Sequence, residues 1–245
     1  RQGEVFHRYI LGVYDLYERL NTAFPQILFE SCASGGGRFD PGILYYAPQG
    51  WTSDDTDAAE RVKIQYGTSM CYPVSSMGSH VSVVPNHQLN RKTPLHTRAN
   101  VAYFGTFGYE LDLNKLSDEE IREVKQQITF MKEYRELIQF GTFYRLKSPF
   151  EGNETAWMTV SEDKKTALVF WYRERNVVNA DFTRVRLQGL DPDLIYRNEY
   201  NGTENYGDEL MNLGLLTTDC TAGEPTSEDE PCTDYESRIY VLTAK

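Results

Sequence analysis

Apolar side chains recur at helical spacing at the start of the chain. This spacing predicts a helix with the apolar positions Val5, Phe6, Tyr9, Ile10, Val13, Tyr17 and Leu20. Pro25 interrupts the pattern, and the apolar stretch QILFESC that follows indicates a buried strand ending in the glycine-rich turn ASGGGRFD. Strand and helix therefore begin to alternate.

The alternation continues to about residue 140. The polar stretch WTSDDTD leads into a helix with one shared face, made of Ala58, Val62, Gln65 and Tyr66. A long polar stretch, SSMGSHVSVVPNHQLNRKTPLHTRAN, is predicted to be a functional loop, and a strand is predicted at residues 107–111. Ser117 and Glu120 form a capping box for a further helix with the apolar stripe Ile121, Val124, Ile128, Met131 and Ile138. This order is typical of a parallel α/β fold.

Beyond residue 140 the apolar period changes from helical to alternating. Short β-rich runs separated by polar turns follow, namely TAWMTVSE, KTALVFWYR, RVRLQGL, LIYRNEY and SRIYVLTAK. This spacing is typical of an antiparallel β-sandwich. We therefore place a domain boundary within residues 141–149.

Charge and composition exclude some function classes. The 245 residues carry a formal charge of -11, whereas nucleic-acid binders concentrate Lys and Arg on one face. No apolar run approaches the roughly 20 residues that a membrane span requires. We therefore expect neither a nucleic-acid partner nor a membrane partner, and an uncharged or cationic small molecule fits better as substrate.

The four cysteines form no CxxC pair of the kind that binds metals. Cys32 and Cys71 are predicted to be free, buried thiols. Cys220 and Cys232 flank an acidic segment, and a local disulfide between them is an open alternative to two free thiols.

Asp54, Asp55 and Asp57 crowd three carboxylates into four positions. Mutual repulsion can keep a proton on one of them, as a general acid requires. Asp residues also cap helices, and spacing alone favours this cap over catalysis. A calcium loop would need a glycine at its sixth position and a glutamate at its twelfth, and both are missing. Since no histidine stands in a HExxH arrangement either, we expect neither a metal nor another cofactor.

The glycine-rich stretch ESCASGGGRFD matches neither GxGxxG nor GxxxxGK, so a nucleotide site is weakly supported. Glycines after a strand let the backbone approach a ligand closely, with Cys32 and free amides facing its hydroxyl groups. A plain tight turn explains the pattern equally well.

Longer motifs add a resemblance. The motifs are ESCASGGGRFDPGILYYAPQGWTSDDTDAAERVKIQYGTS, SSMGSHVSVVPNHQLNRKTPLHTRANVAYFGTFGYELDL and the β-rich end. Together they resemble the C-terminal half of bacterial α-galactosidases of glycoside hydrolase family 36. The resemblance covers nearly the whole chain and is weakest after about residue 200.

The resemblance implies a fold and a mechanism. Residues 1–142 would be the C-terminal portion of a (β/α)8 TIM barrel, and residues 143–245 an antiparallel β-sandwich domain. The family retains configuration at the anomeric carbon, because one aspartate attacks that carbon and a second protonates the leaving oxygen. Galactose-containing oligosaccharides of the raffinose type, mainly α-1,6-linked, would be the substrates.

The family's WTSD(D/N)TD motif carries the acid/base aspartate. Asp54 matches it, because the next acidic position tolerates Asn; Asp55 is the second choice and Asp57 the third. The residues that would contact the sugar are Cys32, Ser34, Gly35, Gly36 and Trp51. Arg38 and Asp40 would hold the glycine-rich loop.

The family's nucleophile lies in a KWDxN-like strand, and this motif is absent from the chain. We therefore expect the chain alone to be inactive, to need the N-terminal part of the same enzyme as a partner, and to form a homo-oligomer in the bacterial cytoplasm.

Three alternatives remain beside the α-galactosidase. Two are related enzymes, an α-N-acetylgalactosaminidase and a galactosyl transferase of the raffinose-synthase type; the loop near C2 of the sugar is expected to crowd an acetamido group. The third is a non-catalytic fragment for sugar binding or assembly.

Overall fold

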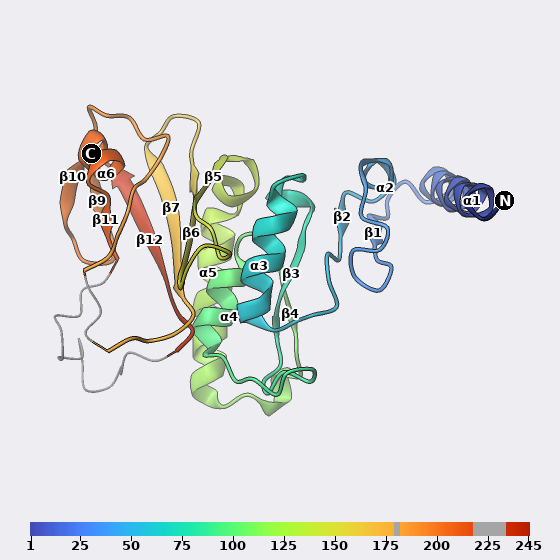
Figure 1. Ribbon diagram of the computed structural model, residues 1–245, viewed down its shortest axis with the longest axis horizontal. Helices are drawn as coiled ribbons and strands as arrows, with labels where there is room; N and C mark the ends of the chain where they lie inside the picture. Colours follow the sequence, from blue (N-terminus) through green and yellow to red (C-terminus); the bar gives the residue numbers. More distant parts are fainter. Residues whose placement is uncertain (179–181, 218–233) are drawn as a thin grey trace.

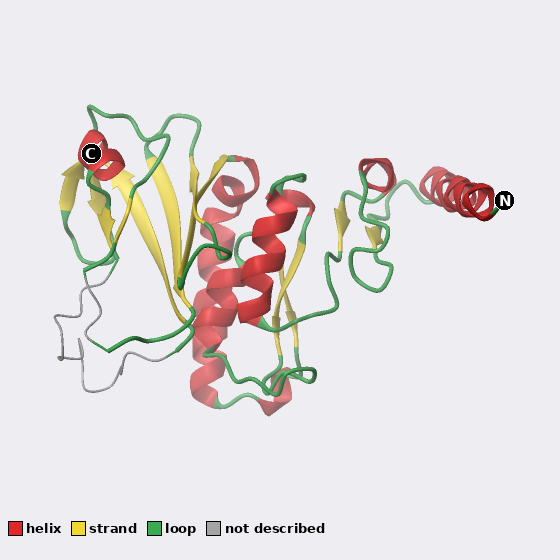
Figure 2. Ribbon diagram, in the orientation of Figure 1, coloured by secondary structure: helices red, strands yellow, loops and turns green. Residues whose placement is uncertain are grey.

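The computed structural model describes residues 1–178, 182–217 and 234–245. Three parts follow one another in space (Figure 1): an N-terminal arm, a central group of helices and short strands, and a C-terminal sheet. Figure 2 shows that helices dominate the first two parts and strands the third. Within these three ranges, no helix has both the length and the apolar character that crossing a bilayer would require.

Parallel strands run through the first two parts in chain order. β1 (Glu30–Ser31) pairs with β2 (Gln49–Gly50), and β3 (Gly78–Ser82) pairs with β4 (Thr106–Glu110). A parallel bridge between Gly50 and Met77 links the two pairs. The parallel strands expected from the sequence are therefore present.

A helix follows each parallel strand. After α1 (Gln2–Ala23), these helices are α2 (Pro41–Tyr46), α3 (Ala58–Ser69), α4 (Leu95–Ala102) and α5 (Asp118–Phe140). Short 3-10 turns, η1 (Val74–Ser76) and η2 (Leu113–Lys115), precede β3 and α5. The predicted shared face of α3 is buried, and both hydrogen bonds of the Ser117–Glu120 capping box are present.

The prediction of one long polar loop before β4 is wrong, because β3 and α4 lie within it. Both elements bury polar residues: Ser79 and Ser82 in β3, and Thr97 and Arg98 in α4. Arg98 Nη1 donates to the Ser82 carbonyl at 2.7 Å, and Ser79 Oγ donates to Gln65 Oε1 at 2.9 Å. Hydrophobic periodicity could not reveal such elements, and the loop proper covers residues 83–94.

The prediction of a buried strand at QILFESC is also wrong in extent and burial. Only Glu30–Ser31 is a strand, and Leu28 is 88% exposed. In the described part of the chain β1 pairs with β2 alone, and of the apolar residues Ile27, Leu28 and Phe29 directly before it only Phe29 is partly covered, by the ring of Tyr17 at a centroid distance of 6.2 Å. The helix α1 forms as predicted, but none of its residues is buried.

The C-terminal part is a six-stranded antiparallel sheet with the order β10-β9-β12-β7-β6-β5. Its strands are β5 (Thr142–Lys147), β6 (Glu154–Val160), β7 (Thr166–Arg173), β9 (Ile195–Asn198), β10 (Glu204–Tyr206) and β12 (Glu236–Ala244). A separate pair joins β8 (Arg184–Val185) to β11 (Leu215–Leu216), and α6 (Gly207–Asn212) precedes β11. The five predicted β-rich runs all contain strands, while β5 lies where we placed the domain boundary.

Both faces of this sheet are buried, because alternate side chains of β7 enter different clusters. Leu168 and Phe170 pack with residues of α3, α4 and α5, whereas Val169 and Trp171 pack with residues of β8, β11 and α6. Trp157 of β6 stacks on Phe170 with ring centroids 4.3 Å apart. Helices and sheet thus share one hydrophobic cluster across residue 142, and the division into two domains there stays a prediction.

Candidate active site

The carboxyl ends of β1 and β2 lie side by side. Ser31 is in register with Gly50, and the Trp51 amide donates to the Ser31 carbonyl at 2.9 Å. Two loops leave this edge: the glycine loop (residues 33–37) after β1 and the acidic segment (residues 53–57) after β2. In parallel α/β folds, ligands bind at the carboxyl ends of the strands.

The glycine loop touches the backbone of the acidic segment. Gly35 has a φ of +74°, and a Cβ atom there would lie 2.8 Å from the Asp54 nitrogen. A Cβ atom on Gly36 would lie 2.7 Å from the carbonyl oxygen of Thr52, which directly precedes the acidic segment. Glycine is needed here because only a residue without a side chain allows this approach. The two loops are therefore fixed relative to each other.

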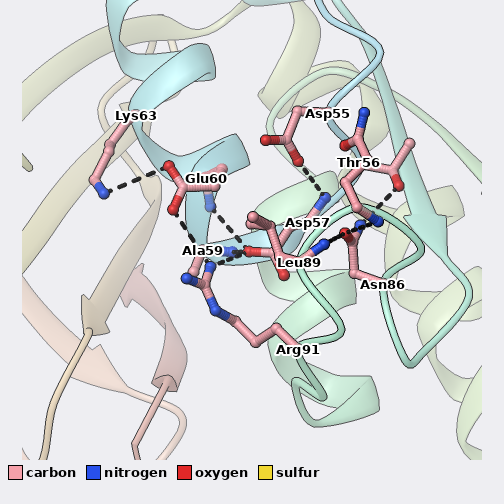
Figure 3. A network of polar contacts seen from close by, with 10 residues as sticks. Asp55, Thr56, Asp57, Ala59, Glu60, Lys63, Asn86, Leu89 and Arg91 are labelled. Atoms are coloured by element: carbon pink, nitrogen blue, oxygen red, sulfur yellow. Dashed lines mark hydrogen bonds and ion pairs between the residues drawn. The ribbon is translucent and has the colours of Figure 1, made fainter.

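The three aspartates have different surroundings. Asp57 is buried and caps α3, since its Oδ1 accepts from the amides of Ala59 at 3.0 Å and Glu60 at 3.2 Å. Asp55 Oδ1 accepts from the Asp57 amide at 3.0 Å (Figure 3). Asp54 is exposed, and its carboxylate makes no hydrogen bond or ion pair with any residue that the structure describes. Asp57 is thus the residue that caps the helix, and the Asp54 carboxylate is available to contact a ligand.

A cation from a distant loop completes the surroundings of Asp57. Arg91 Nη1 donates to Asp57 Oδ1 and lies 3.4 Å from Glu60 Oε1 (Figure 3). Burial lowers the pKa of Arg91, but the hydrogen bond and the charge of Asp57 outweigh burial, so the net pKa is raised. Asn86 Nδ2 also donates to Thr56 Oγ1 at 3.2 Å. Sequence reasoning missed Arg91 and Asn86, because only the fold brings them to the acidic segment.

Trp51 is 9% exposed, and its ring packs against other side chains. His80 of β3 stacks on it with centroids 4.5 Å apart, and the Arg61 guanidinium carbon lies 4.6 Å from its centroid. Arg61 donates to the Gly78 carbonyl at 2.8 Å, and burial lowers its pKa to about 10 against the opposing effect of Asp55. Contact between Trp51 and a sugar stays a prediction, and His80 belongs to a strand instead of the polar loop expected for it.

Cys32 lies directly before the glycine loop. Its carbonyl accepts from Arg38 Nη2 at 2.8 Å, and Arg38 Nη1 donates to the Tyr9 hydroxyl of α1 at 3.0 Å. Asp40 caps α2 through the Ile43 amide at 2.9 Å. Arg38 therefore ties the residue before the glycine loop to α1. Asp40 fixes the start of α2 and its support of the loop stays a prediction, as do the sugar contacts of Cys32, Ser34, Gly35 and Gly36.

The prediction that Cys32 and Cys71 are buried is wrong. Both are free thiols, and both are exposed, because they stand in loops at the ends of β1 and α3. Cys220 and Cys232 lie outside the described residues, and so does the disulfide that we considered between them. The described ranges contain no group of three or more His, Cys, Asp or Glu side chains able to hold a metal ion.

Comparison with known proteins places this arrangement in a family. Residues 1–141 match the melibiase family, and residues 154–242 match the glycosyl hydrolase family 36 C-terminal domain. Alpha-galactosidase AgaA of Geobacillus stearothermophilus is 57% identical over 88% of this chain, and alpha-galactosidase 1 of Pediococcus pentosaceus is 52% identical over 100% of it. The chain spans 29% and 32% of the lengths of these relatives.

A solved structure agrees with the sequence relatives. The crystal structure of the family 36 alpha-galactosidase AgaA from Geobacillus stearothermophilus matches 98% of this chain with a TM-score of 0.90 at 51% identity. The match covers 32% of that protein. This chain therefore belongs to glycoside hydrolase family 36.

Proposed function

We propose that this chain supplies the acid/base half of a retaining exo-α-galactosidase. One observation carries the proposal: Asp54 presents an unpaired, exposed carboxylate at the carboxyl edge of parallel strands, beside the glycine loop. Its neighbours Asp55 and Asp57 are engaged in hydrogen bonds within the acidic segment.

The strand–helix part fits one portion of a barrel. β1 to β4 are parallel neighbours in chain order, and a helix follows each of them, as in a (β/α)8 barrel. We assign residues 1–142 to the C-terminal portion of such a barrel and residues 143–245 to an antiparallel β-sandwich. Functional loops of these barrels lie at the carboxyl ends of the strands, where Asp54 is found.

Asp54 would act twice in the reaction. Its protonated carboxyl gives a proton to the glycosidic oxygen as the bond to the anomeric carbon breaks and a second carboxylate forms the glycosyl-enzyme. The ionised Asp54 then takes a proton from water, whose oxygen attacks the anomeric carbon and releases the nucleophile. The nucleophile must stand about 5 Å from Asp54 and would come from outside these residues.

The proposed substrates are galactosides of the raffinose type. Structures of AgaA variants, similar to this chain at a TM-score of 0.90, are in complex with raffinose and with stachyose. Gly35 packs against the backbone of the acidic segment and Gly36 against Thr52 just before it, so the glycine loop has no space to move on this side. This rigidity favours a hydroxyl over an acetamido group near C2, and galactosidase over the N-acetylgalactosaminidase alternative.

The N-terminal arm supports the proposal of a partner from the same enzyme. Within residues 1–28 the exposed large apolar side chains are Val5, Phe6, Tyr9, Leu11, Leu16, Phe24, Ile27 and Leu28. So many exposed apolar side chains in one short stretch favour coverage by protein. A homo-oligomer and a cytoplasmic location stay predictions.

Replacing the corresponding region of AgaA by this chain tests the proposal. The chimera should hydrolyse p-nitrophenyl α-galactoside and raffinose, whereas the chain alone should hydrolyse neither. Asp54→Asn should lower kcat/KM, which reports formation of the glycosyl-enzyme, by about 10²- to 10⁴-fold on raffinose and much less on the p-nitrophenyl substrate, whose leaving group needs no proton. An inactive but folded chimera, or an Asp54→Asn chimera with full activity on raffinose, would overturn the assignment.

A further inference from the structure

We propose that Arg91 is a positioning residue that couples the acidic segment to the C-terminal sheet. This inference rests on the proposed function, because it concerns the geometry of the segment that carries Asp54. Arg91 stands in the loop between β3 and α4 and touches neither Asp54 nor the glycine loop in any hydrogen bond or ion pair.

One side of Arg91 faces the acidic segment. Its guanidinium binds Asp57, which is 2% exposed, and approaches Glu60 in the first turn of α3. Asp57 in turn donates its amide to Asp55 and accepts the first amides of α3. A shift of the Asp57 carboxylate would therefore move both the start of α3 and the turn that carries Asp54 and Asp55.

The other contact of Arg91 is with the C-terminal sheet. The guanidinium carbon lies 5.2 Å from the ring centroid of Tyr235, which directly precedes β12. A cation within about 6 Å of an aromatic face is attracted by its electrons. Arg91 thus contacts the acidic segment and the sheet at once.

Tyr235 is itself held firmly. Its amide donates to the Glu174 carbonyl at 3.0 Å, and its carbonyl accepts from Thr97 Oγ1 of α4 at 2.8 Å. Ser237 Oγ donates to the same Thr97 hydroxyl at 3.1 Å, and Asn100 Nδ2 donates to Ser237 at 3.0 Å. The beginning of β12 is therefore tied to α4, and the ring offers Arg91 a fixed support.

The planar guanidinium suits this double contact. It binds a carboxylate through one edge while its face rests on a ring, which a lysine ammonium cannot reproduce. Loss of Arg91 would leave the buried Asp57 carboxylate without its cation, and Asp57 would have to move towards water or lose hydrogen bonds. A displacement of about 1 Å is enough to lower catalysis about 10²-fold.

Two measurements test the inference, one on the chain and one on the active chimera. Hydrogen exchange in the 245-residue chain should show faster exchange of the amides of Asp57, Ala59 and Glu60 in Arg91→Gln. In the chimera, Arg91→Gln should lower kcat about 10- to 100-fold with KM changed less than about threefold. Arg91→Lys should recover part of the loss, and guanidinium ion should partly rescue Arg91→Ala.

Matched variants separate positioning from general stability. Lys147→Gln removes another half-buried ion pair, with Glu154, far along the chain in β5 and β6, and should leave kcat and the exchange of these amides unchanged. Tyr235→Phe keeps the ring and should be neutral, whereas Tyr235→Leu should act like a weaker Arg91→Gln. If Arg91→Gln does not fold, Arg91→Lys and Tyr235→Leu replace it in both measurements.

The outcomes are distinct. If exchange at Asp57, Ala59 and Glu60 is unchanged, or if kcat falls no further than in Lys147→Gln, Arg91 does not position the segment. If the wild-type chimera is inactive while Arg91→Gln still loosens these amides, the proposed function fails and the coupling stands.

Discussion

Gly35 lies in backbone contact with Ser53: a Cβ atom at position 35 would come within 2.6 Å of Ser53 Cα. The φ of +74° at Gly35 is, in addition, a conformation that side chains rarely adopt. The glycine loop after β1 and the acidic segment after β2 are thus in fixed contact next to Asp54, the proposed acid/base residue.

We expect Gly35→Ala to separate the two loops and to abolish the activity of the chimera. The added methyl meets backbone atoms that cannot rotate away, so one loop has to move. Steady-state kinetics on raffinose measures the effect. Gly67→Ala in α3 is the control, because a Cβ atom there would meet no atom within 4 Å beyond the backbone of its own helix. This change should stabilise the helix by about 0.5–1 kcal/mol. A fully active Gly35→Ala chimera would show that the contact is dispensable.

Asp57→Ala should destabilise the chain, whereas Asp54→Ala should not. Loss of the helix cap at Asp57 costs about 0.5–2 kcal/mol, and the loss of the partner of Arg91 adds to it. Asp54 is exposed and makes no such contacts, so its replacement should stay within about 0.5 kcal/mol. Chemical denaturation of both variants measures the two free energies of unfolding, and equal values would contradict the division of roles.

How far the sequence predicted this fold depended on the kind of residue that each element buries. The helix α5 was found because Val124, Met131 and Ile138 form an apolar stripe behind a capping box. In contrast, β3 buries Ser79 and Ser82, whose hydroxyls carry no apolar period. Polar burial is stabilised by partners that are distant in sequence, so a local pattern does not reveal it.

The candidate site shows the same limit. Spacing favoured a helix cap for the three aspartates, and the structure assigns that cap to Asp57 alone. The link from Arg91 to Asp57 spans 34 positions. Only the resemblance of long motifs singled out Asp54, since an exposed carboxylate without partners has no local signature.

Stability should depend on pH through Glu120. Hydrogen bonds from the amide and side chain of Ser117 lower the pKa of Glu120. Because the folded-state pKa is lowered, the stabilisation is complete above the ordinary pKa of about 4.5 and is lost as pH falls through the folded value. The melting temperature of Glu120→Gln should therefore lie below that of the wild type near neutral pH, and the gap should narrow in acid.

Glu119→Gln is the control for this prediction, because it removes a charge from the same turn of α5 and leaves the capping box intact. Thermal melts from pH 3 to 7 compare the three proteins. A gap between wild type and Glu120→Gln that is the same at all pH values would mean that ionisation of the capping carboxylate does not contribute.

Trp157→Ala should destabilise the helices and the sheet together. Trp157 is 1% exposed and lies in the cluster that joins Phe104 near α4 to Phe170 of β7. Replacing a buried Trp by Ala costs about 3–5 kcal/mol, whereas Phe140→Ala, at 79% exposure, should cost less than about 0.5 kcal/mol. When unfolding is monitored by hydrogen exchange, the amides of α5 and β7 should lose protection in one step. Separate steps would mean that the two parts unfold as independent domains divided near residue 142.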